Sequence, residues 1–375
     1  MADLPETEST AMINDHHLHD LVIRQIAEYL QGENKTLVSL MSICKRFYSL
    51  RHIFIAQIYL SSRQSTYAYT YRPPGWNKVY SMSFDSENRL VDLSEFKHLK
   101  EISLRHTHCI RDFTPLASIH SVFLYLSRIQ DVSPLSRVHT LHLEQCNQII
   151  DVTPLAEVNT LSLIQCNNIR DVTALSTVHH LELNQCYCIR DVNPLGGVHT
   201  LEISNMELDD VSGLGTVKHL DFCFCRIKSV IGLGQVPFLR LTYCHVFNGD
   251  TYTSLGENHT LIIENPPTGG YDVSTFGRVH RLVIRGSEHL TDVSALKTVH
   301  FLTLDNCPRL SDVSALGTVN TLVLKNCPNI RYVSYLIGVK NLIINNCSGI
   351  RNIDPLHKVP RLRITNCKHL PDVNR

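Results

Sequence analysis

The chain has 375 residues, and its 35 basic side chains balance 35 acidic ones, so the formal net charge is zero at pH 7. A neutral chain has no strong field to attract a phosphate backbone or an anionic lipid surface, so we expect neither nucleic acid nor membrane as a partner. No apolar run is long enough to cross a bilayer.

The N-terminal part follows a different pattern from the rest. Residues 1–15 are polar and acidic, without the basic and apolar regions of a secretory signal, and we expect them to be disordered. Residues 16–58 carry apolar side chains at helical spacing in two runs, separated at Gly32–Lys35, and this predicts a small helical domain. Residues 59–80 contain alternating tyrosines and Pro73-Pro74-Gly75, which predict a short ordered connector and N-terminal cap.

From residue 81 to residue 375 the chain repeats one motif. Leu141 and Leu143 alternate as in a short strand, Cys146 and Ile149 follow, and Asp151-Val-Thr-Pro-Leu155 forms the return. The return contains proline and is too short for an α-helix, so we expect extended or 3₁₀ structure there. The pattern predicts a solenoid of about fifteen coils with a parallel sheet on its concave face and no convex α-helices. The first apolar strand residues are 82, 102, 122, 141, 161, 181, 201, 220, 239, 261, 282, 302, 322, 342 and 362.

This motif resembles the leucine-rich repeat, whose L-x-x-L-x-L-x-x-C-x-x-I pattern runs here from Val138 to Ile149. The cysteine is similar to that of the cysteine-containing class, and the Asp-Val-Thr-Pro-Leu return is similar to the short repeats of internalin-like proteins. The resemblance covers about residues 82–373 and implies an extended binding surface, with no cofactor and no catalytic residues. No nucleophile–base pair, phosphate loop or metal-ligand spacing stands out, and we therefore expect no enzyme activity.

The helical segment resembles an F-box. The family pattern L-P-x-E-I-x-x-x-I-x-x-Y-L lies along Leu18–Leu30, and L-x-x-L-x-x-V-C-K-R-W lies along Leu37–Phe47, with His19 in place of proline and Leu21 in place of glutamate. Combined with leucine-rich repeats, this resemblance implies a substrate receptor that binds a Skp-family adaptor and, through it, a cullin–RING ubiquitin ligase. The alternative is a plain interaction scaffold whose helices only cap the solenoid. The residues implied to bind the adaptor are Leu18, Leu21, Val22, Ile26, Leu30, Leu37, Leu40, Ile43 and Phe47.

Three residue types recur once per coil. Nine of the 13 cysteines stand five residues after the first strand residue, which predicts a buried column of reduced thiols and a location in the cytoplasm or nucleus; no pair has the spacing of a zinc site. An aspartate, as at Asp151, precedes the return in ten coils, and we expect it to cap the turn with its side chain in preference to binding calcium. A histidine, as at His179 and His199, precedes many strands, and neighbouring copies are expected to stack.

The solvent-facing strand positions change character along the array. Positions from 180 to 221 are polar and mildly acidic, whereas those from 238 onward mix aromatic, β-branched and cationic side chains. That mixture is typical of interaction surfaces, so we expect an exposed stripe that binds a protein target. The coil spacing, elsewhere 19 to 21 residues, lengthens to 22 between Leu239 and Leu261, beside the irregular segments 247–250 and 265–270. The target-binding residues we predict are Phe238, Arg240, Arg281, Val283, Arg285, Phe301, Val323 and Lys325.

Overall fold

The computed structural model describes residues 57–60, 81–85, 93–246, 252–266 and 273–374. The helices expected within residues 16–58 lie almost wholly outside this part of the chain. The nine residues expected to bind an adaptor, from Leu18 to Phe47, all lie outside it, so their assignment stays a prediction.

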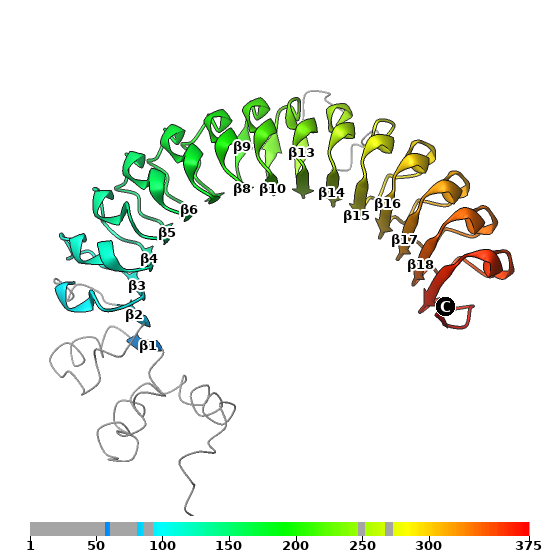
Figure 1. The fold of residues 1–375 in the computed structure, drawn as a ribbon, viewed down its shortest axis with the longest axis horizontal. Coiled ribbons are helices and arrows are strands. Elements are labelled where there is room, and N and C mark those ends of the chain that lie inside the picture. Colours follow the sequence, from blue (N-terminus) through cyan, green and yellow to red (C-terminus); the bar gives the residue numbers. More distant parts are fainter. Residues whose placement is uncertain (1–56, 61–80, 86–92, 247–251, 267–272, 375) are drawn as a thin grey trace, which may run out of the picture.

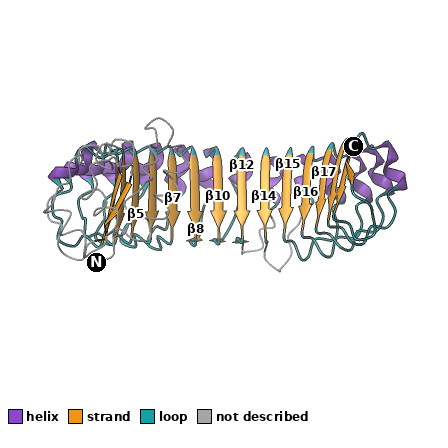
Figure 2. Cartoon of the chain, turned by 90° about the horizontal axis from the view of Figure 1, so that it is seen from below, coloured by secondary structure: helices purple, strands orange, loops and turns teal. Residues whose placement is uncertain are grey.

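The described coils form an arc with strands along its inner side (Figure 1). All fifteen strands expected from the repeats are present, and each pairs in parallel with the next, leucine opposite leucine, as at Leu141 and Leu161. Viewed from the concave side, they form one continuous row (Figure 2). The strands are β2 (Ser81–Asp85), β3 (Glu101–Arg105), β4 (Ser121–Tyr125), β5 (Thr140–Glu144), β6 (Thr160–Ile164), β7 (His180–Asn184), β8 (Thr200–Ser204), β10 (His219–Cys223), β12 (Phe238–Thr242), β14 (Thr260–Glu264), β15 (Arg281–Arg285), β16 (Phe301–Asp305), β17 (Thr321–Lys325), β18 (Asn341–Asn345) and β19 (Arg361–Thr365).

Two further strands bring the described sheet to 17. β1 (Gln57–Leu60) pairs in parallel with β2, and β20 (Val373–Asn374) pairs antiparallel with β19. Neither strand belongs to the repeat, and the repeat pattern did not indicate them. β20 covers part of the edge of β19, where unpaired backbone groups would otherwise be left.

The return side of each described coil is a 3₁₀ helix, as the short proline-containing segments predict. In η5 (Thr153–Glu157), Pro154 stands in the first turn, where its missing N–H costs nothing. The other 3₁₀ helices are η2 (Ser94–Phe96), η3 (Thr114–Ser118), η4 (Ser133–Leu135), η6 (Thr173–Thr177), η7 (Asn193–Gly197), η8 (Ser212–Thr216), η9 (Leu233–Gln235), η10 (Thr253–Glu257), η11 (Phe276–Arg278), η12 (Ser294–Thr298), η13 (Ser314–Thr318), η14 (Ser334–Gly338) and η15 (Asp354–Lys358).

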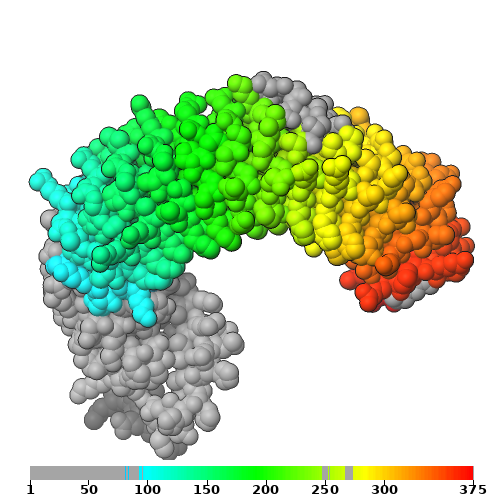
Figure 3. Space-filling model, turned by 45° about the horizontal axis from the view of Figure 1, so that its top comes forward, coloured from blue at the N-terminus to red at the C-terminus, as the bar shows by residue number. Residues whose placement is uncertain are grey.

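The core fills the space between the sheet and the 3₁₀ helices. In one coil, Leu141, Leu143, Cys146, Ile149 and Leu155 are each fully buried. Burial of a leucine or isoleucine side chain stabilises a fold by about 1.5–3 kcal/mol, but one coil exposes both of its flanks. The coils therefore stack into one arch, which Figure 3 shows in space-filling form.

Three central coils differ from the others. Where regular coils make a turn after the strand, these form short strands that pair into a second parallel sheet: β9 (Glu207–Leu208), β11 (Arg226–Ile227) and β13 (His245–Val246). The spacing from Leu201 to Leu220 and from Leu220 to Leu239 is 19 residues, whereas the third of these coils, from Leu239 to Leu261, has 22. In all three coils the chain after the strand is extended where regular coils turn.

The convex side of the central coils carries a row of glycines, one per coil, each directly after the buried leucine or phenylalanine of its 3₁₀ helix. A Cβ atom on Gly215 would lie 2.5 Å from the carbonyl oxygen of Gly232, and one on Gly234 would lie 2.2 Å from that of Ser254. Neighbouring coils therefore approach so closely here that no side chain fits between them. The row consists of Gly196, Gly215, Gly234, Gly256 and Gly277.

Candidate binding surface

The concave face displays three side chains per strand, at the first, third and fifth positions. In the typical strand β17, Thr321, Val323 and Lys325 are half-buried, whereas Leu322 and Leu324 point into the core. Because the strands pair in register, each position forms a row across the sheet. The surface is therefore three rows of side chains running along the arc.

The N-terminal half of this face is acidic in its middle row. Glu182, Glu202 and Asp221 lie side by side on β7, β8 and β10. Ser162 donates a hydrogen bond to Glu182 over 2.7 Å, and His180 lies 3.7 Å from Glu202. The acidic character expected for positions 180–221 is thus present as one contiguous strip.

Asp221 and Arg240 form the boundary between the two halves. Their carboxylate oxygen and guanidinium nitrogen are 3.0 Å apart. Desolvation of the partly buried Asp221 raises its pKa, against the opposing effect of Arg240. Beside this pair, the His219 and Phe238 rings stack with centroids 3.8 Å apart. Phe238 and Arg240, both predicted to bind a target, are half-buried at this boundary.

Val283 is buried, contrary to the exposed stripe expected from the sequence. Its side chain is 5% exposed, and that of Ile262 is 9% exposed. The two residues are cross-strand partners on β14 and β15, so their side chains cover each other. The aliphatic stripe is therefore interrupted, and its accessible part consists of the half-buried Val323 and Ile343, with the half-buried Thr303 beside Val323.

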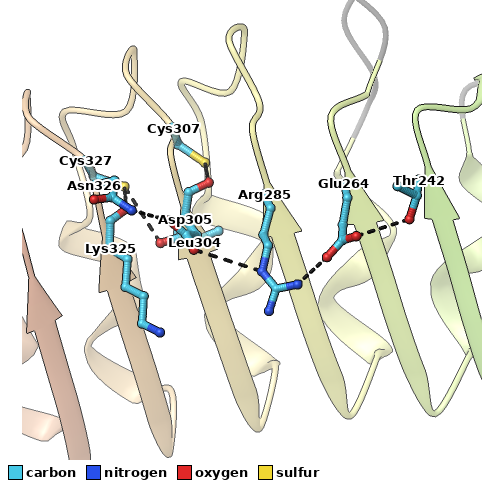
Figure 4. Close-up of polar contacts among 9 residues, drawn as sticks. All are labelled: Thr242, Glu264, Arg285, Leu304, Asp305, Cys307, Lys325, Asn326 and Cys327. Atoms are coloured by element: carbon cyan, nitrogen blue, oxygen red, sulfur yellow. Dashed lines mark hydrogen bonds and ion pairs between the residues drawn. The ribbon is translucent and has the colours of Figure 1, made fainter. Parts of the chain in front are cut away.

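Arg285 belongs to a line of polar side chains at the strand ends, which we call the polar ladder (Figure 4). Its guanidinium pairs with Glu264 on one side, and its Nε lies 4.0 Å from Asp305 on the other. Thr242 donates a hydrogen bond to Glu264 over 3.1 Å, and Asn326 donates one to Asp305 over 2.7 Å. Arg285 therefore bridges two coils, although its side chain is 48% exposed.

The remaining predicted target residues lie on the accessible surface. Arg281 is exposed, with its guanidinium carbon 5.8 Å from the centroid of the Phe301 ring. Phe301, Val323 and Lys325 are half-buried at neighbouring positions of β16 and β17. Figure 4 shows the Lys325 side chain extending away from the polar ladder. The structure thus groups these four residues on one face, and their role in binding stays a prediction.

Sequence reasoning missed an aromatic pair at the middle of the array. Phe224 and Tyr243 follow β10 and β12, are 55% and 50% exposed, and stack with centroids 4.7 Å apart. Both have left-handed backbone conformations, with φ of 53° and 52°. Bulky residues seldom adopt this conformation, which asparagine tolerates. The sequence could have revealed the pair, because most other coils have asparagine or glutamine at this position.

The recurring histidines stack as the sequence predicts. His120 and His139 have ring centroids 4.4 Å apart, and His179 and His199 are 4.5 Å apart. A further stack joins His259, His280 and His300 at 4.8 Å per step. Desolvation lowers the pKa of His280, and the two neighbouring imidazoles lower it further.

The cysteine and aspartate columns also take their expected places. All twelve described cysteines are free thiols, and the nine in the column are buried. Burial raises the pKa of Cys146 and Cys186 to about 11. Asp151 accepts a hydrogen bond from the backbone N–H of Thr153 over 2.8 Å, and this bond lowers the pKa of Asp151. Turn capping is therefore the role of the aspartates in most described coils.

Within the described ranges, no group of three or more His, Cys, Asp or Glu side chains is arranged to hold a metal ion. No helix in the described part of the chain is both long and apolar enough to span a membrane.

Comparison with known proteins bears on the fold. No protein-family model matches the chain, and no curated protein matches it significantly. Among solved structures, a leucine-rich-repeat protein of Leptospira interrogans is similar, with 12% identity, 78% of this chain and 79% of that chain covered, and a TM-score of 0.51. The described part of the chain is therefore a leucine-rich-repeat solenoid.

Two internalins of Listeria monocytogenes are also similar. InlF has 18% identity, with 76% of this chain and 86% of that chain covered and a TM-score of 0.46. The functional domain of InlJ, which is described as including a cysteine ladder, has 17% identity, with 76% and 68% covered and a TM-score of 0.46. Because no family model matches, the F-box resemblance of residues 18–47 stays a prediction.

Proposed function

We propose that the solenoid is a non-enzymatic scaffold that binds a protein partner on its concave face. The observation that carries this proposal is the group formed by Arg281, Phe301, Val323 and Lys325, which lies on adjacent strands of one solvent-facing sheet. Aromatic, aliphatic and guanidinium groups side by side combine desolvation with directional hydrogen bonding, as in the energetically dominant parts of protein interfaces.

A photo-crosslinking experiment tests this proposal. A benzophenone side chain at Phe301 samples the concave face, and the same side chain at Tyr335, which is 65% exposed on η14, samples the convex face of nearby coils. We expect discrete protein adducts from position 301 in the source cells and none of the same mass from position 335. Identical adducts from both positions would contradict a concave site.

We further propose that the N-terminal segment makes the chain a substrate receptor of a Skp–cullin–F-box ubiquitin ligase. The support is the match of residues 18–47 to the F-box pattern, followed after a short connector by leucine-rich repeats. In this proposal Leu37, Leu40 and Phe47 are apolar anchors in a groove of the adaptor. It also places the protein in the cytoplasm or nucleus, where unpaired thiols persist.

Adaptor binding separates the receptor from the plain scaffold. The Leu40→Asp variant should lose co-purification with a Skp-type adaptor, because an unpaired carboxylate at an apolar contact is strongly unfavourable. The full chain should bind, and the chain lacking residues 1–50 should not. If the full chain shows no binding at micromolar adaptor, the scaffold proposal stands and the receptor proposal falls.

A further inference from the structure

Charge is unevenly distributed along the concave face. The solvent-facing positions of β3 to β10 in the main sheet carry five carboxylates and one arginine, whereas those of β15 to β19 carry five cations and one carboxylate. We call the second group, on β15 to β19, the basic surface. A chain whose net charge is zero thus presents two halves of opposite sign on one face.

Most cations of the basic surface have no acidic partner in the described part of the chain. Its single carboxylate, Asp305, is taken up by Arg285 and Asn326 in the polar ladder. The ion pairs of the described residues include Arg240 and Arg285 but none of the other four cations on the surface. Those four are Arg281, Lys325, Arg361 and Arg363.

These cations surround the accessible β-branched residues of the middle row. Thr303, Val323 and Ile343 lie in register in the middle row, and Arg363 continues that row on β19. Arg281 and Arg361 lie in the row formed by the first strand positions, and Lys325 lies in the row formed by the fifth positions. A segment crossing these strands would meet apolar contacts along its centre and positive charge on both sides.

The dimensions suit a short stretch of polypeptide. Four strand spacings of about 4.8 Å separate β15 from β19, a span of about 19 Å that about six extended residues cover. Each strand would then face one or two residues of the segment. Charges buried at such a contact need partners of opposite sign.

We propose that the basic surface binds an acidic polypeptide segment that carries aliphatic side chains. This inference rests on the proposed concave binding function and specifies its partner. The observations favour polypeptide over single-stranded nucleic acid, because Phe301 is the sole aromatic residue among the fifteen described positions of this surface, and stacking on several aromatic side chains is the usual means of holding bases.

The experiment measures binding of three fluorescent probes to the full chain by anisotropy. The probes are a peptide of alternating glutamate and valine, its counterpart of alternating glutamine and valine, and a single-stranded oligoadenylate. We expect the glutamate peptide to bind at least about tenfold more tightly than the glutamine peptide, and its affinity to fall with added salt.

A pair of double variants locates the site. Arg361→Glu with Arg363→Glu, both exposed on β19, should reduce the affinity for the glutamate peptide by about tenfold or more. Arg331→Glu with Arg351→Glu is the matched control, because these exposed arginines lie in the two preceding coils, after β17 and β18 and outside the sheet, and it should leave the affinity unchanged. Unchanged thermal unfolding of both variants shows that each remains folded.

Several results would overturn the inference. They are no binding of the glutamate peptide, equal binding of the glutamine peptide, equal losses in both double variants, or tighter binding of the oligoadenylate. Failure of this inference is distinguishable from failure of the concave site. If the benzophenone at position 301 still captures a protein when Arg361 and Arg363 are reversed, the concave binding function stands and the acidic partner does not.

Discussion

The regular C-terminal coils and the three central coils share the same kind of core, but they differ in the segment that follows each strand. In the regular coils, an asparagine such as Asn326 or Asn346 follows most C-terminal strands and is hydrogen-bonded to its neighbours. In the central coils, the equivalent residues are Asn205, Phe224 and Tyr243, and the following turn is replaced by a second small sheet. This replacement leaves the concave sheet intact and changes only its border.

The largest expected effect is the loss of stability when a core side chain is truncated in either region. Phe222 is the single phenylalanine among the fully buried fourth strand positions of the described repeats from β3 onward. Phe222→Ala should destabilise the central coils by about 3–5 kcal/mol, and the matched Leu324→Ala should destabilise the regular coils by about 2–5 kcal/mol. Hydrogen exchange should show lost protection centred on β10 and β17 respectively. Uniform loss along the array in both variants would contradict a division into regions.

The second effect concerns the polar ladder that connects the central coils to the C-terminal ones. Arg285→Glu would place three carboxylates in a row with Glu264 and Asp305, and we expect a loss of about 1–2 kcal/mol, limited by solvent screening. Arg281→Glu has no such neighbours and should stay within about 0.5 kcal/mol of the parent protein. Chemical denaturation measures both changes. Equal stabilities would show that the ladder contributes nothing.

The third effect concerns the residues that follow the strands, which are aromatic in two central coils and asparagine in most regular C-terminal coils. Phe224→Asn with Tyr243→Asn introduces the residue type used in the regular coils. Relief of the left-handed strain gains about 1–2 kcal/mol per residue, and loss of the aromatic pair costs about 0.5–1.5 kcal/mol as well as some apolar burial. We expect a net change in unfolding free energy of about 1 kcal/mol or less. A loss well above that value would mean that the central border is a structural requirement.

The smallest effect concerns the histidine column, which the central coils interrupt with Lys218 and Pro237. The pKa of His280 is lower in the folded state, so the unfolded state binds the proton more readily. Stability is therefore full above the unfolded value of about 6.5 and declines as the pH falls through it towards the folded pKa. His280→Asn, the residue type of Asn159 and Asn320 in this column, should reduce the loss of stability between about pH 7.5 and about pH 5.5. An unchanged slope would contradict the assignment.

Sequence alone was sufficient for the fold because the same constraints recur in every coil. Alternating leucines, one cysteine and a proline-containing return predicted the strands, the buried thiols and the 3₁₀ helices. The exposure of individual side chains on the concave face was harder to predict, because the exposure of Val283 depends on its cross-strand partner Ile262. The Arg285 pairs could have been found by aligning the fifth strand positions, since Glu264 and Asp305 occupy them on the adjacent strands.

The features outside the repeat motif were less accessible from sequence. β1 and β20 lie outside the repeats, and the small sheet of β9, β11 and β13 forms in coils of 19 and 22 residues, so coil length did not predict it. Phe224 and Tyr243 depart from the asparagine or glutamine found at this position in most other coils, yet only the structure shows that they stack in a left-handed conformation.

The glycine row lies on the convex side of the arc, where the spacing of the coils determines the curvature. Strands on the inner side are held at a fixed pitch by backbone hydrogen bonds, so the radius depends on how far apart the outer 3₁₀ helices lie. From Gly196 to Gly277 the outer spacing is closed to the limit that a coil without a side chain permits. An added methyl group at Gly234 would lie 2.2 Å from the carbonyl oxygen of Ser254, so it would act as a wedge that opens the outside and brings the acidic and basic ends of the concave face closer together.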